Sequence, residues 1–165
     1  EYILQITESK IPLLRRKIGT FFQYFKILLN RTVFENVAVP LEVIGAKESE
    51  IEKEVSSTLE KVGLLEKAES FPAQLSGGEV QRTAIARAIV AKPEVLLADE
   101  PTADLDPATA TQVIELLEKI NKDDKTIIIM ATHNVAIVNH FKKRVVTLKK
   151  GKLASDVKEG KYDSD

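Results

Sequence analysis

Two short apolar runs with a helical pattern between them constrain this chain more than any other feature of its sequence. The first run, residues 94–99, ends in Asp99, and the second occupies residues 126–131. Such runs are typical of strands buried on both faces of a parallel sheet. Between them, Asp106 and Pro107 are preferred residues for an N-cap and the first helical position. The order strand–helix–strand predicts an α/β fold with a mainly parallel sheet.

The first half of the chain is mainly helical in pattern. Residues 18–22 predict a further strand, and residues 26–75 predict a helical insert. Capping-box spacing, in which Ser or Thr precedes Glu by three residues, marks helix starts at Thr32–Glu35, Ser49–Glu52 and Ser76–Glu79. Pro40 and Gly45 are expected to interrupt the insert, and Gly63 to end its second helix.

Turn residues divide the C-terminal part. Residues 122–124 are expected to form a turn, and Asn134 to cap a short helix. Residues 145–148 and 152–154 flank Gly151 and predict a hairpin. With 165 residues, we expect one domain over residues 1–165. We divide it into the insert at about 26–75, a second part at 76–157 and a polar tail at 158–165.

Composition excludes several classes of protein. The absence of cysteine rules out disulfide frameworks and thiol nucleophiles and favours a reducing compartment. A net charge of −1 gives no basic field for nucleic acid, so no nucleic-acid partner is expected. No apolar run approaches the roughly 20 residues of a membrane span.

The segment Leu-Ser-Gly-Gly-Glu-Val-Gln-Arg opens a predicted helix at residues 75–82. With Ser76 as N-cap and Glu79 as its capping partner, Gly77 and Gly78 leave the helix N-terminus open to close approach. Unpaired N–H groups and the helix dipole make such a terminus an anion site. Taken alone, the segment fits a glycine-rich turn before an ordinary helix better than an anion site.

Acidic residues follow the first buried strand, where open α/β sheets bind their ligands. Asp99 and Glu100 suit a pair in which one carboxylate holds Mg²⁺ and the other activates water. The alternative is two solvated acids at a strand end. His133 follows the second strand, where a capping or surface role is the alternative, and His140 is interpreted as a surface residue.

These motifs occur together in a fixed order. The glycine-rich segment is followed by an apolar strand into Asp-Glu-Pro-Thr, then Ala-Asp-Leu-Asp at 103–106 and Ala-Thr-His at 131–133. In this order they resemble the signature, Walker B, D-loop and switch histidine of the ATP-binding-cassette (ABC) ATPases. Gln23 falls where that family has its Q-loop. The resemblance covers nearly the whole chain and implies the fold of that family's nucleotide-binding domain.

The resemblance also implies ligands and roles. ATP and Mg²⁺ are expected, with hydrolysis of ATP to ADP and phosphate. Asp99 would hold Mg²⁺, and Glu100 would be the general base. Gln23 would contact the metal or water and sense a membrane partner, and His133 would steady the γ-phosphate.

In this family two cassettes enclose two ATP molecules head to tail, so a homodimer is expected. Ser76, Gly77 and Gly78, with Glu79, would then bind the nucleotide held by the opposite subunit. Asp104 is placed with the nucleotide-binding residues and, together with Asp106, would communicate across the dimer.

Within the family, Arg31-Thr32-Val33 and the segment from Leu96 to Thr102 are similar to the cell-division ATPases. These pair with an integral membrane subunit at the cytoplasmic face of the plasma membrane. The docking surface is expected at residues 24–41, where most apolar residues are interpreted as core. Lipoprotein-release and macrolide-export ATPases remain alternatives. A chromosome-maintenance or DNA-repair ATPase is disfavoured, because only residues 24–74 separate the Q-loop from the signature, without heptads.

The Walker A pattern G-x-x-x-x-G-K-[ST] does not occur in the sequence. Only Gly151 and Gly160 precede a lysine, and neither completes the pattern. Since the chain begins with Glu1 and its only methionine is Met130, we expect an N-terminally truncated cassette that is inactive alone. The alternative is a non-catalytic half-cassette that lends its signature motif in trans.

Overall fold

The computed structural model describes residues 5–22 and 27–160. Along the chain these form α1 (Ile11–Arg16), β1 (Ile18–Phe21), α2 (Val33–Val43), α3 (Glu48–Lys61), α4 (Gly77–Ile89), β2 (Val95–Asp99), α5 (Pro107–Asp124), β3 (Ile127–Ala131), α6 (Val135–Phe141), β4 (Val145–Lys149) and β5 (Lys152–Val157). Short 3₁₀ turns occur at Glu8–Lys10, Leu65–Lys67 and Pro72–Gln74. The chain divides into two compact units, Glu1–Ala131 and Thr132–Asp165.

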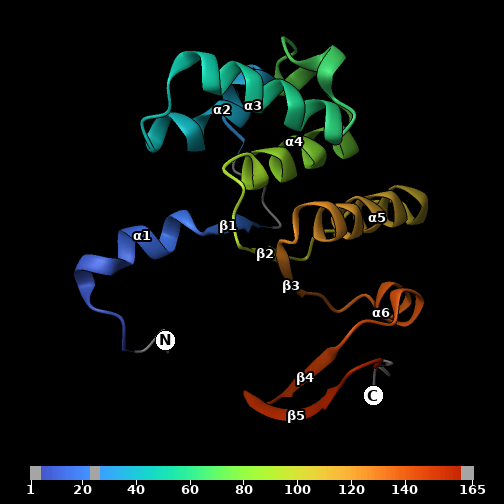
Figure 1. Cartoon of the computed structure of the whole chain (residues 1–165). Helices are drawn as coiled ribbons and strands as arrows, with labels where there is room; N and C mark the ends of the chain where they lie inside the picture. Colours follow the sequence, from blue (N-terminus) through green and yellow to red (C-terminus); the bar gives the residue numbers. More distant parts are fainter. Residues whose placement is uncertain (1–4, 23–26, 161–165) are drawn as a thin grey trace. The chain divides into compact units, whose positions relative to one another are not determined.

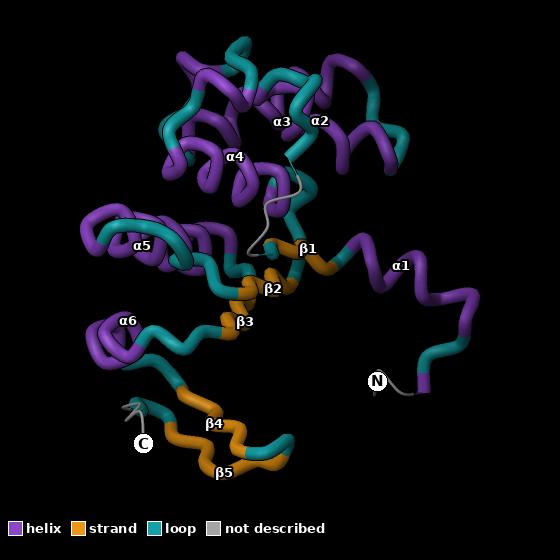
Figure 2. The backbone as a smooth tube through the Cα atoms, turned by 180° about the vertical axis from the view of Figure 1, so that it is seen from behind, coloured by secondary structure: helices purple, strands orange, loops and turns teal. Residues whose placement is uncertain are grey.

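The first unit contains a parallel sheet in the order β1-β2-β3. Its register pairs Leu97 of β2 with Ile129 of β3. Helices α4 and α5 lie on one side of the three strands in both Figure 1 and Figure 2. Gly19 permits close packing on that side, because a Cβ there would collide with the carbonyl oxygen of Ala88 in α4. The predicted α/β class is confirmed.

The other face of this sheet is open. Leu97, Ile127 and Ile129 are 39%, 59% and 57% exposed, whereas Leu96 on the opposite face is fully buried. The prediction of strands buried on both faces is therefore wrong for the described residues, since helices of this unit cover one face only.

Helices α2 and α3 of the insert form a layer with α4, the helix that follows the insert (Figure 1). Val33, Val37 and Leu41 of α2 are buried, as are Val55 and Leu59 of α3. The interpretation of most apolar residues between 24 and 41 as core is confirmed for these α2 positions.

The capping residues in the sequence predicted most helix boundaries correctly. Thr32 caps α2 and Ser76 caps α4, each with the predicted glutamate. Gly63 follows α3 with φ +68°. The Ser49 capping box is wrong, because α3 starts at Glu48 and Glu50 accepts the Lys47 N–H at 3.1 Å.

Two predicted interruptions are also wrong. Helix α2 continues through Pro40 to Val43, and Gly45, with φ +77°, follows its end. Helix α5 includes the predicted turn at 122–124 and ends at Asp124, and its C-cap Lys125 has φ +59°. An ion pair between Lys61 Nζ and Asp124 Oδ1, at 2.7 Å, holds this last turn.

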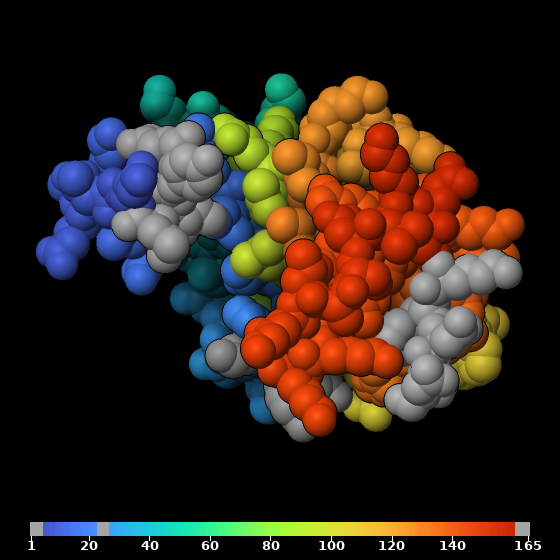
Figure 3. Space-filling view, turned by 90° about the horizontal axis from the view of Figure 1, so that it is seen from below, coloured from blue at the N-terminus to red at the C-terminus, as the bar shows by residue number. Residues whose placement is uncertain are grey.

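The second unit consists of α6 and the antiparallel hairpin β4–β5. Asn134 caps α6 as predicted, since its Oδ1 accepts the Ile137 N–H at 3.1 Å. Lys150 and Gly151 form the hairpin turn, both with positive φ, as a tight two-residue turn requires. Every residue of β5 is exposed, and its atoms lie at the surface in Figure 3.

Candidate functional site

The glycine-rich turn begins α4 in the geometry that the sequence predicts. Ser76 Oγ accepts the Glu79 N–H at 3.3 Å, and Glu79 Oε2 accepts from the Ser76 N–H at 2.8 Å and from its hydroxyl at 2.9 Å. These bonds from the Ser76 backbone and hydroxyl lower the pKa of Glu79. Glu79 is thus a capping residue here, which adds a structural role to the predicted binding role.

The backbone at this turn is accessible. Ser76 and Gly77 are exposed, and a Cβ at Gly77 would meet no atom within 4 Å, so the start of α4 can be approached closely from outside. Exposed N–H groups together with the helix dipole attract anions such as phosphate. Nucleotide contact at this accessible turn stays a prediction.

The predicted Walker B residues form a tight turn after β2. Glu100 has φ +47° and Asp104 has φ +60°, a left-handed conformation that is uncommon for residues with side chains. The Glu100 N–H donates to the Ala131 carbonyl of β3 at 2.9 Å, and the Ala103 N–H donates to the Glu100 carbonyl at 3.1 Å. A left-handed backbone costs energy at residues other than glycine, and it also occurs at Lys92, Lys125, Lys142 and Lys150. Asp99 is exposed and Glu100 is half-buried.

The glycine-rich signature turn contacts the start of α5, the helix that follows the acidic turn. A Cβ added to Gly78 would lie 3.0 Å from Thr109 Cγ2. Thr109 Oγ1 and N donate to Asp106, the N-cap of α5, and these bonds lower the pKa of Asp106. The signature turn and the D-loop segment of the first unit are therefore adjacent.

A metal ion at Asp99 would have few ligands from the protein. Among residues 5–22 and 27–160, no group of three or more His, Cys, Asp or Glu side chains is placed to hold a metal ion. Mg²⁺ commonly takes one or two carboxylates and completes its shell with water and substrate phosphates. Asp99 supplies one such carboxylate and fits that donor set.

The remaining predicted residues lie elsewhere. Gln23 and Tyr24 fall outside the described residues. His133 is exposed and belongs to the second unit, between the end of β3 and the α6 cap, where the Asn134 N–H donates to Thr132 Oγ1 at 3.1 Å. His140 is exposed, with its ring against Phe141.

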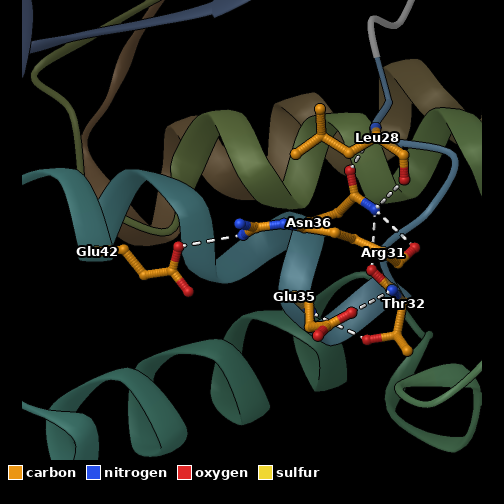
Figure 4. A network of polar contacts seen from close by, with 6 residues as sticks. All are labelled: Leu28, Arg31, Thr32, Glu35, Asn36 and Glu42. Carbon is orange, nitrogen blue, oxygen red and sulfur yellow. Dashed lines mark hydrogen bonds and ion pairs between the residues drawn. The ribbon is translucent and has the colours of Figure 1, made fainter.

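Asn36 is a structural residue that the sequence analysis gave no role. It is fully buried in α2, where its Oδ1 accepts the Leu28 N–H at 2.8 Å (Figure 4). Its Nδ2 lies 3.0, 3.1 and 2.9 Å from the carbonyl oxygens of Leu28, Arg31 and Thr32. The side chain therefore fixes the loop that follows the predicted Q-loop. A polar residue beside the apolar stripe of Val33 and Val37 was the available signal.

Gln81 is a second such residue. It is fully buried in α4, and neither its Oε1 nor its Nε2 has a hydrogen-bond partner in the described structure. Buried amides without partners are rare and costly. The sequence placed Gln81 in the signature segment, but it gave no sign that the side chain is buried.

Comparison with known proteins identifies the class that this fold and site define. Residues 3–103 match the ABC transporter family. The chain belongs to this family.

Particular relatives are similar over nearly the whole chain. The cell division ATP-binding protein FtsE of Bacillus subtilis is 53% identical over 159 residues, which are 96% of this chain and 69% of that protein. FtsE of Mycobacterium tuberculosis is 50% identical over 99% of this chain and 71% of its own length. For FtsE of Escherichia coli K12 the identity is 47%, over 94% of this chain and 69% of the relative. Family resemblance thus supports an ATP-binding, ATP-hydrolysing protein of cell division.

Solved structures confirm the predicted ABC fold. The dimeric ATP-binding cassette MJ0796, bound to ADP and Pi, gives a TM-score of 0.79 with 33% identity, over 96% of this chain and 70% of that one. The cbiO1 protein of Clostridium perfringens, part of the ABC transporter complex cbiONQ, gives 0.86 with 31% identity, over 93% and 61%. None of the helices in the described residues has the length and apolarity to cross a membrane.

Proposed function

We propose that this chain is the signature-bearing part of an FtsE-type ATPase that hydrolyses ATP between two cassettes and drives a membrane subunit in cell division. One observation carries the proposal: the signature turn at Gly78 packs against the start of α5, directly after the strained acidic turn. The turn that we assign to nucleotide contact and the turn that we assign to hydrolysis therefore both adjoin the start of α5 in the first unit.

The proposed chemistry assigns a role to each turn. Glu100 accepts a proton from the attacking water, while its left-handed backbone and its bond to Ala131 hold the carboxylate at the strand end. Asp99 holds Mg²⁺. The metal, when bound, screens the phosphate charge. Ser76, Gly77 and Gly78 contact the γ-phosphate of ATP on a second cassette, Gly77 and Gly78 through their backbone N–H groups.

Three further residues complete this proposal. His133 steadies the γ-phosphate, Gln23 reports on the membrane subunit, and Asp104 communicates between cassettes. The membrane subunit is an FtsX-like permease, docked at the surface after Gln23, which places the chain at the cytoplasmic face of the plasma membrane. The cassettes act as a homodimer.

A second candidate follows from the lack of a Walker A pattern in the sequence. In it, the chain is a half-cassette without turnover, which contributes Ser76 to Gly78 to a nucleotide on an intact cassette. Both candidates predict that the isolated chain does not bind Mg-ATP measurably.

The roles are tested in a chain extended at its N-terminus by the preceding segment of the Bacillus subtilis relative. Glu100→Gln should lower ATP turnover at least ~100-fold and leave ATP binding unchanged. Glu115→Gln, an exposed acid on α5, is the matched control and should keep full activity. Normal turnover in the Glu100→Gln protein would refute the general-base role. An extended wild-type chain that binds ATP without turnover would favour the half-cassette.

A further inference from the structure

Thr109, in the first turn of α5, contacts the signature turn with one group and the helix cap with another. Its side chain is half-buried. The hydroxyl Oγ1 donates to Asp106 Oδ2 at 2.5 Å, and the backbone N–H donates to Asp106 Oδ1 at 3.1 Å. The methyl Cγ2 faces Gly78, where a Cβ built on the glycine would lie 3.0 Å from it. Thr109 therefore joins two segments to which the sequence analysis gave separate roles.

The two contacts of Thr109 depend on each other. The hydroxyl and the methyl share one Cβ, and a β-branched side chain has few allowed χ1 rotamers in a helix. The rotamer in which Oγ1 bonds to Asp106 therefore also decides where Cγ2 lies against Gly78. The hydroxyl bond is also the largest cause of the lowered pKa of Asp106, ahead of the backbone bonds.

Thr111, one position further along the same face of the chain's register, shows what a helical threonine does without such a task. It is half-buried like Thr109, and its hydroxyl donates to the Pro107 carbonyl at 2.9 Å. A bond of this kind, to the carbonyl of the preceding turn, is common for threonine within a helix. Thr109 instead gives its hydroxyl to a carboxylate, and hydrogen bonds to ionised groups are about twice as strong as those between neutral groups.

We propose that Thr109 is a positioning residue for ATP hydrolysis: its methyl sets the place of the signature turn at Gly78, and its hydroxyl holds Asp106. A displacement of either segment is then passed to the other through one side chain. Small displacements of groups that orient a substrate are costly, since about 1 Å can lower a rate roughly 100-fold. The consequence for hydrolysis rests on the proposed function, whereas the coupling of Gly78 to Asp106 rests on the contacts of Thr109 alone.

The coupling is tested in this chain without nucleotide. Thr109→Val keeps the branched shape and removes the hydroxyl, while Thr109→Ser keeps the hydroxyl and removes the methyl. In an NMR titration of the Asp106 carboxylate, Thr109→Val should raise its pKa, and Thr109→Ser and the matched control Thr111→Val should leave it unchanged.

The methyl is tested by a double-mutant cycle in thermal melts. Gly78→Ala should cost more in the chain with Thr109 than together with Thr109→Ser, because the second substitution removes the atom that the new Cβ meets. We expect a difference of about 2–4 °C between the two effects. Equal effects of Gly78→Ala in both backgrounds, or an Asp106 pKa that Thr109→Val does not move, would overturn the coupling.

The consequence for hydrolysis is measured in the chain extended by the preceding segment of the Bacillus subtilis relative. Thr109→Val and Thr109→Ser should each lower kcat ~10-fold and change KM for ATP less than about 2-fold, since Thr109 acts on the geometry of the closed site. Thr111→Val should keep full turnover. In an Asp106→Ala background, Thr109→Val should cause no further loss, because its hydroxyl acts through Asp106.

The outcomes separate the two proposals. If both Thr109 variants turn over like Thr111→Val, or raise KM at unchanged kcat, the positioning role is overturned, while Glu100→Gln still decides the proposed function. If the extended wild-type chain does not hydrolyse ATP, the proposed function fails and the role in hydrolysis fails with it. The coupling between Gly78 and Asp106 is then still decided by the titration and the melts.

Discussion

The Asn36 side chain holds the loop after the predicted Q-loop, and its removal gives the sharpest test of how this region is built. Asn36→Ala would leave the Leu28 N–H and the Arg31 carbonyl without their side-chain partner. The Thr32 and Leu28 carbonyls keep backbone donors, from the N–H groups of Asn36 and Arg31. Each polar group left without a hydrogen-bond partner costs about 1–3 kcal/mol. Because Leu28 is partly exposed, its share is smaller, and we expect the free energy of unfolding to fall by about 3 kcal/mol in total.

Asn36→Asp separates the two halves of this interaction. The carboxylate keeps an acceptor for the Leu28 N–H but places negative charge where Nδ2 now faces three carbonyl oxygens. The pKa of this aspartate in the folded state should therefore be raised above its unfolded value of about 3.9. A raised pKa costs stability as pH rises above the unfolded value, so the variant should be weakest near pH 7 and recover toward pH 4.

Urea unfolding followed by far-ultraviolet circular dichroism measures both effects, at pH 7 and pH 4.5. Asn30→Ala, in the same loop but exposed, is the control and should change stability by less than about 0.5 kcal/mol. An Asn36→Ala protein within that same margin, or an Asn36→Asp protein as stable as wild type at pH 7, would refute the assignment.

Three further predictions concern the site. Gln81→Met should raise the free energy of unfolding by about 1–2 kcal/mol, because it removes a buried amide without partners; a loss would reveal a partner for the amide. In thermal melts, Asp104→Val should destabilise by about 1–2 kcal/mol at φ +60°, and Asp104→Gly should not. The lowered pKa of Asp106 means that its cap is lost as pH falls below the ordinary aspartate pKa, near 3.9. Urea midpoints of Asp106→Ala and wild type should thus converge in acid, and a constant difference down to pH 3 would contradict this.

The sequence predicted those features that local chemistry determines. Thr32, Ser76, Asp106 and Asn134 all cap the helices expected from them, because a short polar side chain before an apolar helical stripe has few other uses. Pro40 was misread because a helix tolerates a proline when packing favours its continuation. Here α2 buries Leu41 just beyond it.

Burial and backbone strain could not be predicted in the same way. The apolar runs of β2 and β3 indicated burial on both faces, but one face of each strand is open among the described residues. The left-handed backbone of Glu100 and Asp104 has no signal in sequence, since neither residue is a glycine. Whether the Gln81 amide finds a hydrogen-bond partner likewise depends on the atoms that pack around it, which the order of residues does not show.

The two adjacent signature glycines serve different purposes in this structure. Space is open around Gly77, so its lack of a side chain matters only for what approaches the helix terminus from outside. Gly78 faces Thr109 at a Cβ distance of 3.0 Å, and Thr109 in turn donates to the Asp106 cap of α5. A side chain at position 78 would therefore press on the start of α5 and, through it, on the acidic turn that ends at Asp104. Glycine at 78 is required by the packing between the signature turn and the start of α5, whereas a requirement for glycine at 77 would come from the ligand that we propose.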